Sequence, residues 1–382
     1  MRVCLFNPPL ETCLANRIDV IIEVLHKLKY EIEMIKDIKP VIVYSDSRLF
    51  NKYNLFLPFR LFRTLFLSMG RFKKRFDLIF SFTDPFRGII GVILGKLLSI
   101  PIVFDLWYTF VDSQIQQGYW RYGGFNHIVG HLVEYLAVKL AGSVLIANYI
   151  KKYVINTYEI SPSKVFPFPN LIDFALYEPA KFNSHEIREK YGIDSNAFLV
   201  MYHGTFLGVH GLEYAIKALP QVISMHPNVK LMLIGPFNEN CKKIENLVKE
   251  LKISNHVIFT GVIPNEIIPK FLNAVDVSLG IFSANPRARR TFRYSAIEAM
   301  AMGLPLITSD SSGVRHLTDY ENVIKVPFED HKSIAEALLY IIENKEERLE
   351  IGKNAREFIF THYNVKKAEK IIKSAIKKAI KG

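Results

Sequence analysis

The chain has 382 residues, enough for two domains that each bury a core, which excludes a mini-protein or a lone binding module. Hydrophobic residues make up 49% of the chain and charged residues 23%, a globular composition that excludes a disordered protein. The formal net charge of +12 indicates an anionic partner, whether nucleic acid, lipid headgroups or a phosphorylated substrate.

Cysteine usage and the apolar runs favour a cytoplasmic protein without a membrane span. The three cysteines are too few for a disulfide framework, and no pair has zinc-ligand spacing. The N-terminus enters the apolar run Val3–Phe6 without a charged leader, so we expect a first strand there. The longest apolar region, 88–104, is interrupted by Lys96 and Pro101, which argues against a transmembrane helix.

Short apolar runs alternate with stretches of helical period along the first half, a pattern typical of β-α-β units around a parallel sheet. The strands predicted there are Val3–Phe6, Tyr30–Ile35, Val41–Tyr44, Leu78–Ser81, Ile102–Phe104 and Val144–Ile146. The fold class is therefore α/β.

The pattern restarts after a proline-rich connection, which places a domain boundary near residue 175. Strands are predicted at Phe198–Tyr202, Val229–Ile234, Val257–Thr260, Val277–Gly280, Leu306–Thr308 and Val323–Val326. Helices are predicted near 211–225, 239–252, 266–274, 294–302 and 331–343. A lysine-rich helix with an apolar stripe closes the chain and must dock on another element.

Common catalytic signatures are missing. The sequence has no Walker phosphate loop, no G-x-G-x-x-G, no H-E-x-x-H and no G-x-S-x-G, which argues against the usual NTPases, dehydrogenases, zinc proteases and serine hydrolases. It also lacks Asp-x-Asp, which counts against a metal held by paired carboxylates.

An ordered set of local patterns remains. It consists of Glu134-Tyr135, Ala141-Gly142-Ser143, Pro169-Asn170, Tyr202-His203-Gly204, Phe259-Thr260-Gly261 and Ile297-Glu298-Ala299-Met300-Ala301-Met302-Gly303-Leu304-Pro305. In this order the set resembles the retaining glycosyltransferases of family 4, the glycosyl transferases group 1, over about residues 130–363.

The resemblance implies a GT-B fold of two Rossmann-like domains that face each other across a cleft. We expect an acceptor-binding domain at 1–175, a donor-binding domain at 176–360, and a C-terminal helix, 361–382, that returns to the first domain. The implied reaction moves a sugar, with retention of configuration, from a nucleotide sugar to an acceptor hydroxyl. It needs no metal or other cofactor, because the donor's own phosphate assists deprotonation of the acceptor.

The resemblance assigns the donor site to the second half. Glu298 would hold the ribose, since a carboxylate can accept hydrogen bonds from two hydroxyls; the alternative is a helix cap or a salt bridge within its own helix. The loop at Gly204 would face the phosphates, and Val262 would lie at the base.

The donor loop departs from the family pattern. Thr205 and His210 stand where the family has an arginine and a lysine that clamp the diphosphate, and Arg290 replaces a glutamate eight positions before Glu298. Our hypothesis is that one or two arginines of the segment Arg287–Arg293, which includes Arg289, Arg290 and Arg293, replace this clamp. The alternatives are a solvated basic loop or a lipid-phosphate site.

The first half offers fewer candidates. Asp105 after a predicted strand could steady the acceptor hydroxyl or the developing charge on the sugar, or it could cap a helix. Residues 47–76 contain eight basic side chains and no acid, interleaved with phenylalanines, which suits a helix lying on an anionic membrane. The residues expected at the acceptor or membrane patch are Arg17, Arg60, Arg63, Arg71, Lys73 and Lys74.

The sequence thus predicts a cytoplasmic enzyme, peripheral on the membrane, in cell-envelope or lipid-linked glycan synthesis, with a lipid-linked or glycan acceptor and no nucleic-acid partner. A weakened or inactive glycosyltransferase-like subunit is the alternative that the changed loop leaves open. A basic nucleic-acid-binding protein is the more distant one, motivated by charge alone.

Overall fold

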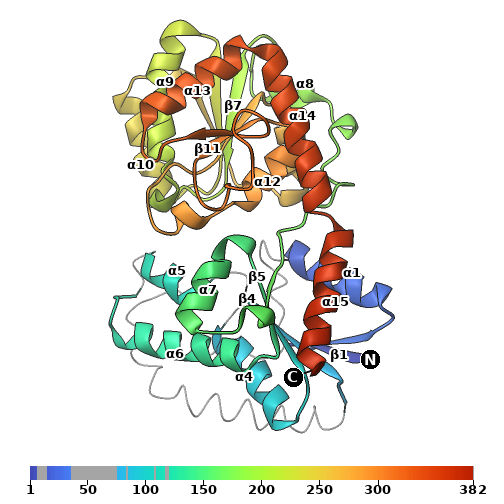
Figure 1. Ribbon diagram of the computed structural model, residues 1–382. Helices are drawn as coiled ribbons and strands as arrows, with labels where there is room; N and C mark the ends of the chain where they lie inside the picture. Colours follow the sequence, from blue (N-terminus) through green and yellow to red (C-terminus); the bar gives the residue numbers. More distant parts are fainter. Residues whose placement is uncertain (7–14, 36–74, 83–84, 107–108, 117–119, 382) are drawn as a thin grey trace. The chain divides into compact units, whose positions relative to one another are not determined.

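The computed structural model describes residues 1–6, 15–35, 75–82, 85–106, 109–116 and 120–381 (Figure 1). The chain divides into two compact units. Unit 1 comprises Met1–Leu171 together with Val365–Gly382, and unit 2 comprises Ile172–Asn364. The first unit is therefore built from both ends of the sequence, and its boundary lies close to the predicted residue 175.

Unit 1 is a parallel six-stranded sheet of order β2-β1-β3-β4-β5-β6. Its strands are β1 (Arg2–Phe6), β2 (Glu31–Ile35), β3 (Leu78–Phe82), β4 (Ile102–Leu106), β5 (Ser143–Ile146) and β6 (Val165–Pro167). Its helices are α1 (Ala15–Lys27), α4 (Pro85–Leu97), α5 (Phe110–Gln116), α6 (Phe125–Leu140), η2 (Asn148–Ile150), α7 (Lys151–Tyr158), η3 (Pro162–Lys164) and α15 (Val365–Lys381).

Both faces of the central strands in unit 1 are buried, which is why their sequences are continuous apolar runs. On one face, Phe104 and Val144 pack with α4, α6 and α7. On the other face, Val3 and Leu145 pack with α1 and α15.

Helix α15 supplies much of that second face. Its buried residues Ala368, Ile372, Ala375, Ile376 and Ala379 form the apolar stripe. The alanines allow close approach: a Cβ on Gly142 would lie 2.9 Å from the Cα of Ala379. Figure 1 shows α15 beside α1, which is the contact expected of a stripe that must dock.

Unit 2 is a second parallel six-stranded sheet, of order β12-β11-β10-β7-β8-β9. Its strands are β7 (Phe198–His203), β8 (Val229–Ile234), β9 (Val257–Gly261), β10 (Val277–Leu279), β11 (Leu306–Ser309) and β12 (Ile324–Val326). Its longer helices are α8 (Ser184–Lys190), α9 (Leu212–Met225), α10 (Glu239–Glu250), α12 (Tyr294–Ala301), α13 (His331–Glu343) and α14 (Lys345–His362). Shorter turns are η4 (Pro179–Lys181), η5 (Gly208–His210), η6 (Ser254–His256), η7 (Asn265–Ile267), α11 (Ile268–Leu272) and η8 (Ala288–Arg290).

The predicted strands of unit 2 are all present, and their ends lie within one residue of the predicted bounds. In unit 1 the structure adds β6, and β4 continues through Asp105 to Leu106. The predicted strand Val41–Tyr44 lies outside the described residues. Within the described ranges, no helix is both long enough and apolar enough to cross a bilayer.

Candidate functional site

The strand order of unit 2 reverses beside β7. From β7 the chain adds β8 and β9 on one side, then crosses over to β10, β11 and β12 on the other. Open parallel sheets bind ligands at the carboxyl ends of their strands where the order reverses. The loops that follow β7 and β10 are therefore the place in unit 2 where a ligand is expected.

Backbone hydrogen bonds join these loops into one surface. The N–H of Gly204 after β7 donates to Ile234 at the end of β8 (2.9 Å), and the N–H of Phe282 after β10 donates to His210 (2.8 Å). Because the Gly204 N–H is used, the loop N–H groups left for a ligand begin at Thr205, an exposed residue.

The Arg293 guanidinium lies against the Gly204 loop. Its Nη1 donates to the Tyr202 hydroxyl (2.6 Å), and its carbon lies 5.2 Å from the centre of the Tyr202 ring. Gly204 has φ +132°, and a Cβ there would meet the Arg293 Nη2. A side chain at position 204 would thus compete with the guanidinium for the same space.

The neighbouring arginines bond differently. The Arg289 Nε donates to the carbonyl of Ala284 (2.7 Å), and its guanidinium lies over the Phe328 ring at 4.8 Å. The Arg290 Nε donates to the carbonyl of Pro286 (3.0 Å). The hydrogen bonds of Arg289 and Arg290 stay within the arginines' own loop, whereas Arg293 bonds to Tyr202 on β7, beside Gly204. Arg293 is therefore the arginine that these contacts favour for the clamp hypothesis.

His210 does not supply a second positive charge. Its Nδ1 lies 2.8 Å from the Thr205 carbonyl and 3.0 Å from the Tyr202 hydroxyl. Burial, followed by the repulsion from Arg293, holds the pKa of His210 well below its ordinary value. His210 is therefore neutral and orders the loop around Thr205.

Two residues that sequence reasoning missed hold the Glu298 carboxylate, which lies buried on α12. The Nε2 of His203 lies 2.9 Å from Glu298 Oε2, and the Tyr177 hydroxyl donates to Oε1 in a short hydrogen bond. A carboxylate only accepts, so the Nε2 of His203 carries the proton. Each oxygen keeps a second lone pair for a ligand hydroxyl.

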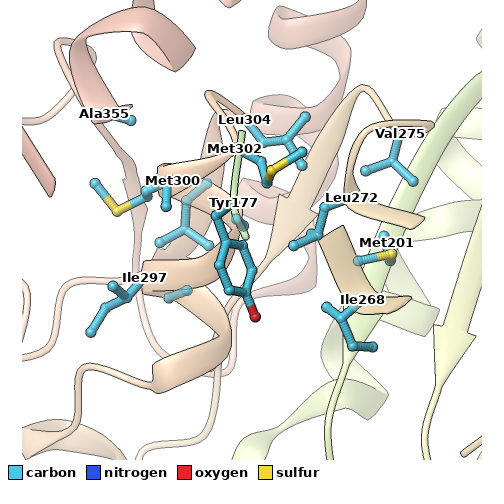
Figure 2. Close-up of a cluster of buried hydrophobic side chains, with 14 of the residues drawn as sticks. Tyr177, Met201, Ile268, Leu272, Val275, Ile297, Met300, Met302, Leu304 and Ala355 are labelled. Carbon is cyan, nitrogen blue, oxygen red and sulfur yellow. The ribbon is translucent and has the colours of Figure 1, made fainter. Parts of the chain in front are cut away.

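Tyr177 is itself tightly fixed. Figure 2 shows its ring among buried side chains, with the hydroxyl oxygen pointing away from Met302 and Leu304. Burial raises the pKa of the Tyr177 hydroxyl, which therefore stays protonated and donates to Glu298. The backbone of Tyr177 is also held, because the Arg356 Nη1 donates to its carbonyl (2.8 Å).

An apolar surface lies beyond β8 and β9. Val262, the predicted base contact, is 71% exposed directly after β9, and Phe237 after β8 is 66% exposed. The Phe237 ring packs over Gly261, where a Cβ would lie 2.8 Å from a ring carbon. Sequence reasoning missed Phe237, although its position after a buried strand was visible.

The site residues predicted in the first half of the chain are not brought together into a site by the described structure. Asp105 is buried within β4, where it pairs in register with Phe82 and Leu145, so the prediction that it follows the strand is wrong. Arg60, Arg63, Arg71, Lys73 and Lys74 lie outside the described residues, as does the side chain of Arg17. Those expectations remain predictions.

Comparison with known proteins bears on the same region. Residues 183–358 match the family model of glycosyl transferases group 1. This group 1 region contains Gly204, Arg293 and Glu298. Spore coat protein SA of Bacillus subtilis is 27% identical over 57% of this chain, and the matched part spans 59% of that protein, less than two thirds of its length. The capsular polysaccharide biosynthesis glycosyltransferase CapM of Staphylococcus aureus is 25% identical over 75% of this chain and 73% of its own.

The fold has a close structural counterpart. Anabaena Alr3699/HepE, crystallised in complex with UDP-glucose, aligns with 98% of this chain and 98% of its own at a TM-score of 0.72 and 17% identity. The two parallel six-stranded sheets with flanking helices match GT-B glycosyltransferase structures, which confirms the predicted fold class.

Proposed function

We propose that this chain is a retaining glycosyltransferase that moves a sugar from a nucleoside diphosphate donor to an acceptor hydroxyl. The observation that carries the proposal is the Arg293 guanidinium against Gly204, at the reversal of strand order and inside the region that matches group 1. The donor class is supported by the structural counterpart, which was crystallised in complex with UDP-glucose.

The proposed donor site extends across the loops of unit 2. Arg293 and the free N–H groups from Thr205 onward bind the diphosphate, and Glu298 accepts hydrogen bonds from the ribose hydroxyls. Val262 and Phe237 offer apolar contact to the base. In this arrangement Arg293 replaces part of the clamp that Thr205 and His210 do not provide.

In the proposed reaction, Arg293 stabilises the charge that develops on the leaving group. As the bond from the sugar C1 to the diphosphate breaks, negative charge grows on the leaving phosphate, where a positioned guanidinium stabilises it. The acceptor oxygen bonds to C1 on the same face, and its proton passes to the leaving phosphate. The proposed reaction uses no metal, in keeping with a sequence that lacks the paired carboxylates of Asp-x-Asp.

We further propose an acceptor from lipid-linked or cell-envelope glycan synthesis and a cytoplasmic location. The role of CapM in capsular polysaccharide biosynthesis supports the first point, and the cysteine usage supports the second. The second candidate function is a glycosyltransferase-like subunit that binds the nucleotide without catalysing transfer. It is favoured by the neutral His210, which stands in place of a cation.

A panel of UDP-, GDP- and ADP-sugars, with release of nucleoside diphosphate as the readout, tests the proposal. We expect turnover with one donor class, insensitive to chelators, and a loss of about a hundredfold in kcat/KM for Arg293→Ala. Arg289→Ala is the matched control, since Arg289 bonds to its own loop. Equal turnover in wild type and Arg293→Ala would contradict the assignment, and nucleotide binding without turnover would favour the subunit.

A further inference from the structure

Helix α6 of unit 1 exposes an apolar stripe. Phe125, Ile128 and Leu132 are 68%, 59% and 54% exposed, and Leu136 on the next turn is also exposed. At about 100° per residue these four positions fall within roughly 80° of one another. We name this set the α6 stripe.

The opposite side of α6 is already packed. Its buried residues Gly130, Glu134, Ala137 and Val138 face the core of unit 1. Glu134 is the single acidic residue of the helix, and its carboxylate accepts hydrogen bonds from the Phe110 N–H and the Tyr158 hydroxyl. A helix that is apolar on both sides is stable where a second apolar surface covers the outer one.

Positive charge gathers at the C-terminal end of the stripe. Lys139 lies in the last turn of α6, and its Nζ donates to the carbonyl of Glu159 (2.6 Å). Lys164 donates to the carbonyl of Ala141 (3.3 Å), and burial, followed by repulsion from Lys96, Lys378 and Lys139, lowers the pKa of Lys164. Lysines from four elements thus lie near one another at the C-terminal end of α6.

We propose that the α6 stripe is a membrane-docking face, in which Phe125, Ile128, Leu132 and Leu136 enter the interface of an anionic bilayer while the lysines at its end contact lipid headgroups. Apolar side chains in line beside basic ones are what such an interface binds. A second copy of the chain is a poorer occupant, because it carries the same excess of positive charge, +12. The α6 stripe belongs to unit 1, whereas the proposed donor site is built from residues of unit 2.

Co-sedimentation of the full chain with phosphatidylcholine vesicles, with and without phosphatidylglycerol, tests the proposal. We expect binding that requires the anionic lipid and weakens with salt. The double variant Ile128→Glu and Leu132→Glu should lose about tenfold or more in vesicle affinity, and Lys139→Glu should lose less. Leu349→Glu is the matched control, because Leu349 is an exposed leucine of α14 in unit 2.

Vesicle binding is measured without any enzymatic turnover, so it tests the docking face independently of the proposed reaction. Circular dichroism and the melting temperature check that the double variant is folded, which we expect because both positions are exposed. As a second measurement, the added fluorescence of Leu132→Trp should shift to the blue on anionic vesicles. Unchanged vesicle binding by the double variant, no binding by wild type, or a wild-type dimer that the double variant converts to a monomer would each overturn the proposal.

Discussion

Replacing Gly204 by alanine tests whether this glycine is needed to admit the Arg293 guanidinium. The residue has φ +132°, a conformation that residues with a Cβ rarely adopt, and its Cβ would meet the Arg293 Nη2. The variant must therefore strain its backbone, displace the guanidinium, or do both.

The structure sets the size of the effect. Backbone strain at such a position costs about 1–3 kcal/mol. Displacing the guanidinium breaks its 2.6 Å hydrogen bond to the Tyr202 hydroxyl, and bonds to charged groups contribute about 1.5–3 kcal/mol. Since Arg293 is half-buried, we take about 1.5 kcal/mol from that range and expect Gly204→Ala to lower the free energy of unfolding by about 2.5–4.5 kcal/mol.

Urea denaturation measures this free energy, with Gly208→Ala as the matched control. Gly208 lies in the same loop, and nothing lies within 4 Å of a Cβ placed there. We expect the control to change the free energy of unfolding by no more than about 0.5 kcal/mol. In an Arg293→Met background the cost of Gly204→Ala should fall to the backbone part alone.

Two results would refute this account. One is a Gly204→Ala variant as stable as Gly208→Ala. The other is an equal cost of Gly204→Ala with and without the guanidinium, which would mean that glycine and arginine do not compete for space. Titration with nucleoside diphosphate adds a functional readout, because a displaced Arg293 should also weaken donor binding.

Three further predictions concern other groups of the two units. His203→Leu removes the hydrogen bond to Glu298 Oε2, so we expect the KM for the nucleotide sugar to rise about tenfold, with a smaller change in kcat. His203→Gln restores an N–H and should recover most of the lost affinity. Equal defects in both variants would argue against a positioning role for His203. Phe237→Ala should weaken nucleoside diphosphate binding by about 1–3 kcal/mol in calorimetric titration, and an unchanged affinity would remove Phe237 from the site. Burial raises the pKa of Glu134 from 4.5 to about 7, so the folded state holds this proton more tightly than the unfolded state does. The stability that this protonated carboxyl contributes is therefore fully present below about pH 4.5, and about 3 kcal/mol of it is lost as the pH rises through 7. In Glu134→Gln the free energy of unfolding should vary less with pH over this range. Parallel curves of unfolding free energy against pH for the two proteins would contradict the assignment.

The sheets could be predicted because the physical signal is local. A strand buried on both faces must be a continuous apolar run, and Val229–Ile234 shows this in six consecutive residues. Strand β6 escaped prediction because it has three residues and ends on Pro167. Asp105 was placed after its strand because a carboxylate inside a buried run breaks the apolar pattern.

The candidate site was harder to predict, because its contacts join residues that are far apart in the sequence. The partners of Glu298 lie 95 and 121 positions away along the chain, and nothing local in the sequence pairs them. The sequence marks the arginine segment as basic, but it does not show that Arg289 donates a hydrogen bond within its own loop while Arg293 donates one to Tyr202 on β7. Arg289 lies in η8 and Arg293 directly before α12, and the residue types alone do not specify these different positions.

The membership of α15 in unit 1 has a consequence for biosynthesis. While the ribosome is still translating Ile172–Asn364, the sheet of unit 1 lacks the helix that packs on β4, β5 and β6. Unit 2 is continuous in sequence and can finish folding first, although it is translated after most of unit 1. The nascent first unit therefore keeps an uncovered apolar face, the kind of surface that chaperones bind, until α15 emerges and covers it.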